Sequence, residues 1–221
     1  MEAAHVIRVA SMNHIIRILS LSLILCGCIL STAVGQIAES SNMINTTLLE
    51  QSSMKIIGSS TLHEWEVDAS EFSVQFQVPG LWFEAQESWE GSDVTQLKVT
   101  VPVDKLDGGK NKMNRDLRDA LKFPEFQTIQ FTWEQISFTD ETETGRRIEV
   151  EGSVTIAGET RKISFDADLS LNESSQIVAS GNVKLNMEEF GVKAPKAFFG
   201  VIRTDEIVNL SFEILLDGEE F

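Results

Sequence analysis

Alternation of apolar and polar side chains at every second position restricts the fold of this chain more than any other feature. It is clearest where Phe72, Val74, Phe76 and Val78 alternate with polar residues, until Pro79-Gly80 predicts a turn. Successive side chains of a β-strand point to opposite faces, so this spacing predicts a strand with one dry and one wet face. Eight segments share the pattern, at about residues 55–69, 72–78, 97–103, 129–138, 148–156, 163–171, 177–187 and 208–214.

Eight such strands predict an all-β fold, because an antiparallel sheet can be dry on one face and solvated on the other. Closing the sheet into a barrel removes its exposed edges, and Ala157-Gly158-Glu159-Thr160 predicts a tight hairpin connection. A two-sheet sandwich is the architectural alternative. An eight-stranded barrel is either filled by its own side chains or hollow enough for one ligand, and the alternation is compatible with both.

One short helix interrupts the strands. Met113, Leu117 and Leu121 follow one another at intervals of four residues, which is a helical spacing. Asn111 is a candidate N-cap and Phe123-Pro124 prevents further helix, so the sequence predicts a helix over about residues 112–122. A lone helix in a sheet protein is typical of a plug or lid; alternatively, its apolar face simply covers one end of the core.

The N-terminal segment has the composition of a secretory signal. Arg8 and Arg17 precede the apolar run 18–30, which is long enough for a signal peptide and short for a membrane span. Small residues before Gln36 predict cleavage there and a periplasmic or secreted protein with no integral membrane span after processing. The alternative is lipid attachment at Cys28, which would anchor the protein as a lipoprotein.

These boundaries give the predicted domain organisation. Residues 1–35 are the signal peptide, 36–53 are a polar lead-in or linker without a sustained period, and 54–221 form the barrel domain. Both cysteines of the chain, Cys26 and Cys28, lie in the segment that is removed. The exported domain is therefore expected to hold no disulfide and to depend on burial for its stability.

Charge and the scarcity of metal ligands disfavour several classes of function. The formal net charge is -16, so nucleic acid is not an expected partner. Outside the signal segment His63 is the only histidine and cysteine is absent, so neither a zinc site nor another cofactor is predicted. A hydrolase would have to combine His63 with an acidic partner, and the chain has no Gly-x-Ser-x-Gly nucleophile elbow. We therefore do not expect an enzyme.

The strand phase also predicts a lining for the barrel. His63 shares a strand face with Trp65; its ring would either hydrogen-bond the polar head of a ligand near the mouth or donate to a neighbouring strand or turn. The candidate ligand-binding residues are His63, Trp65, Phe72, Val74, Phe76, Val99, Val101, Phe131, Trp133, Val154, Phe165, Val183 and Leu185.

Five motifs, in order from Met54 to Leu216, resemble the YceI-like family. They are Ile57-Gly58-Ser59-Ser60-Thr61-Leu62-His63-Glu64-Trp65, then Met113-Asn114 with Leu117 and Leu121, Phe123-Pro124-Glu125-Phe126, Gly152 to Thr160, and Met187 to Val192 with Gly200 to Val208. Glu64-Trp65 stands where the family often has Asp followed by Phe, a difference that affects pocket width more than chemistry.

The resemblance implies an extended, lipocalin-like antiparallel barrel that binds a polyisoprenoid or another long-chain lipid in a secreted or periplasmic protein. The leading hypothesis is a non-enzymatic carrier for such a lipid. The alternative is a structural or stress-related envelope barrel without a bound ligand. A homodimer is left open as a further assembly.

Overall fold

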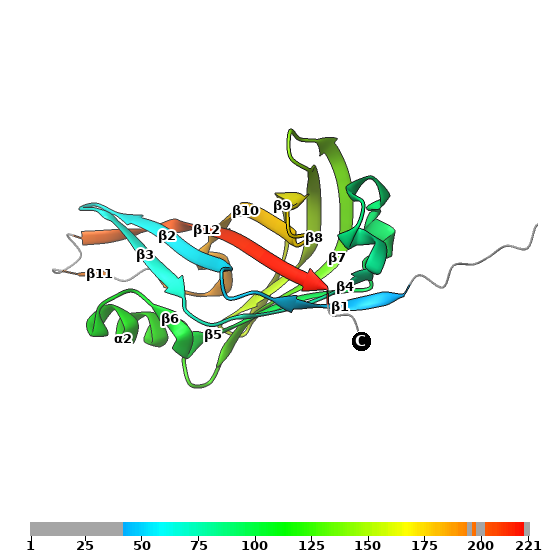
Figure 1. Ribbon diagram of the computed structural model, residues 1–221. Coiled ribbons are helices and arrows are strands. Elements are labelled where there is room, and N and C mark those ends of the chain that lie inside the picture. The colour runs from blue at the N-terminus through cyan, green and yellow to red at the C-terminus, as the bar shows by residue number, and fades with distance from the viewer. Residues whose placement is uncertain (1–41, 194–195, 198–201, 219–221) are drawn as a thin grey trace, which may run out of the picture. The chain divides into compact units, whose positions relative to one another are not determined.

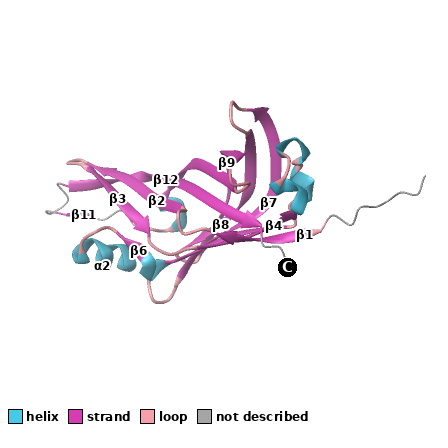
Figure 2. Cartoon of the chain, viewed as in Figure 1, coloured by secondary structure: helices cyan, strands magenta, loops and turns pink. Residues whose placement is uncertain are grey.

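The computed structural model describes residues 42–193, 196–197 and 202–218, which are built almost entirely from antiparallel strands (Figures 1 and 2). The strands are β1 (Met43–Leu48), β2 (Ser53–Ser60), β3 (Glu64–Ala69), β4 (Ser73–Pro79), β5 (Gln96–Pro102), β6 (Leu106–Asp107), β7 (Thr128–Glu141), β8 (Arg146–Ile156), β9 (Glu159–Leu171), β10 (Ile177–Asn186), β11 (Lys196–Ala197) and β12 (Ile202–Gly218). The α-helix is α2 (Asn111–Ala120), and the 3-10 turns are η1 (Gly80–Phe83), η2 (Gln86–Ser88), η3 (Gly91–Asp93), η4 (Val103–Lys105) and η5 (Met187–Phe190). None of the helices in these residues is long and apolar enough to cross a membrane.

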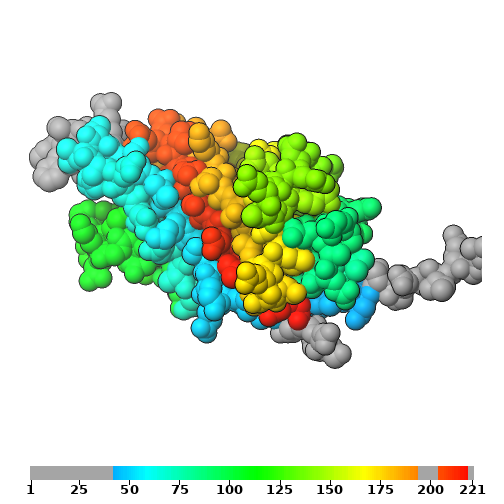
Figure 3. All heavy atoms as spheres, turned by 45° about the horizontal axis from the view of Figure 1, so that its top comes forward, coloured from blue at the N-terminus to red at the C-terminus, as the bar shows by residue number. Residues whose placement is uncertain are grey.

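Eight of the described strands close into a barrel, which confirms the predicted fold class. Their order around the barrel is β1, β4, β5, β7, β8, β9, β10 and β12, and β12 returns to β1 through the pairs Thr46–Gly218 and Leu48–Leu216. The long strand β12 also pairs with β2, and β2 pairs with β3, so the sheet extends beyond the closed ring. In the space-filling view of Figure 3, the blue-to-cyan atoms of β2 and β3 lie beside the red atoms of β12. Closure pairs every barrel strand on both sides, at least along part of its length.

Burial follows the predicted alternation. In β4, Val74, Phe76 and Val78 are buried while Ser73 and Gln75 are exposed. The hairpin between β8 and β9 is also as expected: its loop is Ala157-Gly158, and both residues have positive φ, 49° and 86°. A two-residue loop of this kind matches the twist of the strands, and glycine adopts it without strain.

The N-terminal boundary of the barrel differs from the prediction. Within the lead-in expected over 36–53, Met43–Leu48 form β1, which pairs with both β4 and β12. Asn45, Thr46 and Thr47 interrupt the apolar residues of this short strand, and its burial does not alternate, so the period-two pattern could not reveal it. The described domain therefore includes β1, and the signal peptide expected over 1–35 lies outside the described residues.

The segment predicted as one strand from residue 55 to 69 is two strands joined by a turn. The Ser60 hydroxyl accepts hydrogen bonds from the Leu62 and His63 amides, at 3.3 Å each, and the Ser60 amide donates to the His63 carbonyl at 3.0 Å. A serine that bonds the following backbone amides favours a turn over continued strand. His63 consequently lies in the turn, just before β3.

Helix α2 begins one residue earlier and ends two residues earlier than expected. Asn111 is its first residue and not its N-cap; Lys110 occupies the cap position without a side-chain hydrogen bond. Asn114 instead links the first turn of the helix to the preceding residues: its side chain accepts a hydrogen bond from the Gly108 amide at 2.7 Å and donates one to Asp107 at 2.8 Å. The helix ends before Phe123-Pro124, as the proline predicts.

The two ends of the barrel are built differently (Figure 1). At one end, the η1 to η3 segment inserts Trp82 and Trp89, each only 1% exposed, whose rings stack at 5.4 Å. The Trp89 indole donates to the Trp82 carbonyl at 2.8 Å, and Arg146 donates to the Trp89 carbonyl at 2.8 Å. Side chains therefore close this end. At the other end, helix α2 lies across the barrel.

Candidate functional site

The barrel encloses an apolar cavity of about 750 Å³. Side chains from every barrel strand except β1 line it, together with residues of β2, β3, β6, α2, η1 and η5. Almost all of these side chains are hydrocarbon or aromatic. The interior is therefore hollow and apolar, whereas the alternation pattern was compatible with a filled barrel as well as a hollow one.

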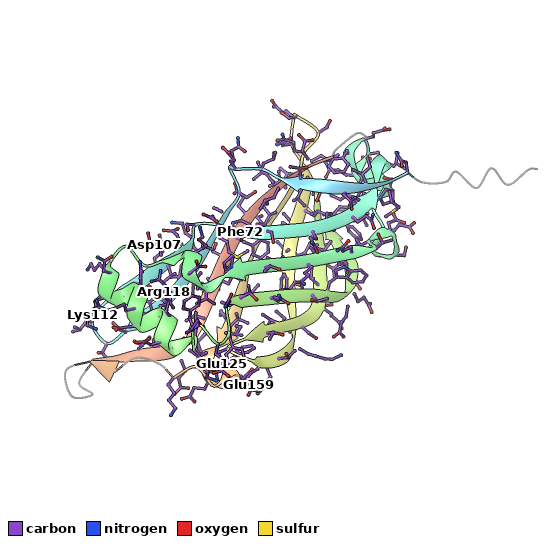
Figure 4. The ribbon with its side chains drawn as sticks, turned by 90° about the horizontal axis from the view of Figure 1, so that it is seen from below. Phe72, Asp107, Lys112, Arg118, Glu125 and Glu159 are labelled. Atoms are coloured by element: carbon purple, nitrogen blue, oxygen red, sulfur yellow. The ribbon has the colours of Figure 1, made fainter. Side chains whose placement is uncertain are left out.

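Eleven of the thirteen predicted ligand-binding residues line this cavity. They are His63, Trp65, Val74, Phe76, Val99, Val101, Phe131, Val154, Phe165, Val183 and Leu185. Phe72 and Trp133 pack against the core but do not line the cavity. Phe72 precedes the first residue of β4 (Figure 4), and Trp133 adjoins a β-bulge where β7 shifts register against β8. A bulge changes which residues of a strand face inward, and alternation alone does not reveal it.

Aromatic rings form a continuous path along the cavity wall. Phe131 on β7 meets Phe165 on β9 edge to face at 5.7 Å, and Phe165 meets Phe212 on β12 at 6.2 Å. Each pair spans an intervening strand that carries a glycine, Gly152 on β8 and Gly181 on β10. A Cβ atom would lie 2.6 Å from the Phe131 ring at Gly152 and 2.8 Å from the Phe212 ring at Gly181. The glycines therefore make room for the rings.

Helix α2 provides part of the boundary that sequence reasoning did not include among the binding residues. Met113, Leu117, Ala120 and Leu121 all line the cavity. The helical spacing of these residues was the sequence feature that could have identified them. Because they line a cavity, a lid describes the position of α2 better than a cover over a filled core. Trp82 and Phe190 also line the cavity. They lie in irregular 3-10 segments, where no periodic pattern indicates which side chains point inward.

Four hydrogen bonds connect α2 and its flanking residues to the barrel domain. Besides the two bonds of Asn114, Arg118, which is labelled in Figure 4, donates to the Asp104 carbonyl at 3.2 Å. Lys122 donates to the Ala157 carbonyl at 3.2 Å. The Asn114 side chain and, secondarily, the Gly109 amide hold the pKa of the Asp107 carboxyl below its ordinary value of 3.8. Hydrogen bonds to a carboxylate favour its charged form.

The polar lining residues gather at the α2 end of the cavity. They are Ser60, His63, Lys110, Lys112, Asp116 and Thr204. Lys112 and Asp116 form an ion pair at 2.5 Å, and His63 is exposed in its turn. The Ser60 hydroxyl donates to the His63 main-chain carbonyl at 2.9 Å. Ser60 is therefore bonded to backbone groups that shape the turn. This geometry serves a structural role better than that of a nucleophile activated by an imidazole.

Metal-ligating side chains are not gathered anywhere in the described ranges: no group of three or more His, Cys, Asp or Glu is placed to hold a metal ion. Apart from Lys112 with Asp116 at the α2 end of the cavity, the ion pairs of the described residues lie on the outer surface, such as Arg147 with Asp168 at 2.9 Å and Lys162 with Glu134 at 2.7 Å. Exposed pairs of this kind contribute little to stability, about 0–1 kcal/mol each. The distinguishing feature of the molecule is its apolar interior.

A family model for the YceI-like domain matches residues 65–216. Among solved structures, Burkholderia cenocepacia BcnA is similar at a TM-score of 0.59 and 15% identity, covering 74% of this chain and 95% of that one. A polyisoprenoid binding domain from Saccharophagus degradans, implicated in plant cell wall breakdown, has a TM-score of 0.55 and 10% identity, covering 79% and 98%. A Campylobacter jejuni YceI protein has a TM-score of 0.52 and 17% identity, covering 70% and 85%. No curated protein matches the sequence significantly.

Proposed function

This chain belongs to the YceI-like family, and we propose that it is a non-enzymatic binding protein that carries a long hydrophobic, isoprenoid-type lipid inside its barrel. The observation that carries the proposal is the apolar cavity of about 750 Å³. Its polar groups lie only at the α2 end, which suits a ligand with a long apolar chain and at most a small polar head. The name of the Saccharophagus degradans relative, a polyisoprenoid binding domain, supports the isoprenoid class.

Burial of the chain alone supplies enough free energy for such binding. Each CH₂ group removed from water contributes about 0.8 kcal/mol, so ten groups contribute about 8 kcal/mol before the cost of immobilising the ligand. A charged anchor is therefore not required. An empty, dry cavity of this size would forfeit dispersion contacts over its whole wall, which favours an occupied barrel. The alternative, an envelope module without a ligand, would be more stable if its own side chains filled the interior.

The test is purification of the full chain from cells that export it, followed by solvent extraction and mass spectrometry. We expect one isoprenoid-type lipid per protein. Phe76→Glu places a charge in the cavity wall and should abolish lipid retention, because an unpaired buried charge costs several kcal/mol. Gln75→Glu changes the adjacent, exposed residue of β4 and serves as the matched control. Repeated absence of stoichiometric lipid from the unaltered protein would favour the ligand-free alternative.

The secretory pattern of residues 1–35 supports a second part of the proposal, that the protein acts in the periplasm or after secretion. A carrier in that compartment would shield an insoluble lipid from water between membranes. Fractionation of expressing cells tests the location: the domain should appear in the periplasmic fraction or the medium. Recovery in the cytoplasm with an intact signal segment would contradict it.

A further inference from the structure

The barrel wall contains a seam between β9 and β10. Their ladder runs from the Leu171–Ile177 pair to the Ala167–Gly181 pair and stops there, although both strands continue and are described throughout. Beyond that point, residues 159–166 pair only with β8, and residues 182–186 pair only with β12. Along this stretch no backbone ladder joins the two strands, so side chains alone complete the wall.

The η5 turn supplies the side chain that fills the seam. Phe190, at 1% exposure, and Val192, at 6%, both line the cavity. The turn begins at Asn186, whose side chain accepts from the Glu188 amide at 3.0 Å, and ends at Gly191 in the left-handed region with φ 64°. A 3-10 turn held by a few local bonds opens more easily than a strand ladder, because fewer hydrogen bonds must break together.

A second pocket, of about 410 Å³, lies against the same seam. It shares Ile163, Leu185 and Phe190 with the main cavity, so these three side chains separate the two spaces. Its other walls include Lys184, Glu189 and the side chain of Ile207, which is 50% exposed. An exposed large apolar side chain beside polar groups suits the passage of an amphipathic molecule.

We propose that the lipid chain enters and leaves the cavity sideways, through the seam between β9 and β10, and that Phe190 is the gate. This inference rests on the proposed function. The alternative route passes the α2 end, where a hydrocarbon would have to move between Lys110, Lys112 and Asp116, displacing their water. Four hydrogen bonds also hold α2 and its flanking residues in place. At the seam, by contrast, the hydrocarbon would pass only the apolar side chains of Ile163, Leu185 and Phe190.

Stopped-flow measurements with a fluorescent geranylgeranyl probe test the gate. Phe190→Ala should raise the association and dissociation rate constants together, each on the order of tenfold, equivalent to lowering the barrier by about 1.4 kcal/mol. The dissociation constant should change much less, because the probe crosses the same barrier when it enters and when it leaves. Leu117→Ala is the control, because it removes an apolar side chain from the α2 boundary of the same cavity. It should weaken binding without speeding entry.

A cross-link provides a second test that leaves the core intact, should Phe190→Ala fail to fold. Ser164 and Lys184 would be partners if the ladder continued, and both are exposed. With Cys26 and Cys28 replaced by serine, the Ser164→Cys and Lys184→Cys thiols can each add to one end of a short bis-maleimide, which joins the two strands through thioether bonds. This cross-link should slow probe entry at least tenfold, on the same scale. The unlinked pair should bind at the original rate.

Unchanged entry in the cross-linked protein, or faster entry in Leu117→Ala but not in Phe190→Ala, would overturn the gate and leave the carrier function standing. An unaltered protein that neither binds the probe nor yields extractable lipid would overturn the carrier function, and the gate with it.

Discussion

At the scale of single residues, the cavity depends on small side chains as much as on large ones. The rings of Phe131 and Phe212 occupy space that only Gly152 and Gly181 leave free. The obstacles around the two glycines differ. A Cβ at Gly152 would lie 2.5 Å from the Thr132 carbonyl oxygen, which is backbone, whereas the nearest atom at Gly181 belongs to the Phe212 ring, which is a side chain.

This difference predicts distinct responses to alanine. Gly152→Ala should lower the free energy of unfolding by about 1–3 kcal/mol, since a strand cannot shift freely. Gly181→Ala should cost less, and adding Phe212→Leu should recover part of that loss; the Gly152→Ala variant should not be recovered by Phe131→Leu. Chemical denaturation of the single and double variants measures these effects. Equal recovery at both sites would show that the ring, and not the backbone, limits Gly152.

Substitution of two phenylalanines on β7 can distinguish a residue that contacts the ligand from one that only packs in the core. Phe131 lines the cavity, whereas Phe138 does not and instead packs edge to face on Trp82 at 6.1 Å. Phe131→Leu should weaken lipid binding several-fold, because the ligand is the neighbour of the lost atoms. Phe138→Leu should leave binding unchanged and lower stability by about 1 kcal/mol. Melting temperature and lipid occupancy, measured for both variants, give the comparison. A large stability loss in Phe131→Leu with unchanged occupancy would contradict a ligand at this position.

At the scale of elements, α2 and β1 each complete the barrel by contacts that their own sequences do not specify. Helix α2 contributes an apolar face to the cavity and is fastened through Asn114 to Asp107 and Gly108. Strand β1 closes the ring between β4 and β12. Either element could form only if the rest of the barrel is present to receive it.

The fastening of α2 predicts a response to acid. Because the folded pKa of Asp107 is lowered from 3.8, its contribution to stability is present above pH 3.8 and is lost as pH falls through the lower folded pKa. Amides of Asn111–Ala120 should therefore lose hydrogen-exchange protection only in strong acid. Asp107→Asn should weaken that protection already at neutral pH. Asp119→Asn, at an exposed position of the same helix, is the control, and an equal effect there would refute the role of Asp107.

The closure by β1 is also testable. The Gly80 amide donates to the Asn42 carbonyl at 2.9 Å, so the alternation of an antiparallel ladder makes Ile44–Val78 the next hydrogen-bonded pair. Ile44→Pro removes that amide and should lower the free energy of unfolding by about 1–3 kcal/mol, with increased binding of a hydrophobic dye. Ile44→Ala keeps the amide and should cost less. Equal costs would mean that side-chain packing, not pairing, holds β1.

At the scale of the whole molecule, charge and apolar surface are separated. The chain has a formal net charge of -16, while the described buried set contains no polar or charged side chain. A charged exterior keeps a protein soluble and discourages self-association. A hydrophobic cargo inside would not alter that exterior, which suits a carrier that moves through water.

The secretory pattern of residues 1–35 predicts that the exported protein has a processed N-terminus. Cleavage before Gln36 should give an intact mass that begins at that residue, since small residues precede the site. A diacylglyceryl modification on Cys28 would instead give a longer, membrane-anchored form. Mass spectrometry of the purified protein distinguishes the two, and Cys28→Ser, which blocks only lipid attachment, is the control.

Local patterns in the sequence were sufficient for most strands, for the Ala157-Gly158 hairpin and for α2, because alternation, turn residues and proline act on neighbouring residues. They also identified eleven of the cavity's lining residues, since inward phase is a local property of a strand. Tertiary structure decided the rest. Strand β1 pairs with residues more than 160 positions away in sequence, the bulge beside Trp133 depends on its partner strand, and Phe190 fills a gap that only the divergence of β9 and β10 creates. Whether the barrel is hollow depends on the sum of all these contacts, which no local pattern contains.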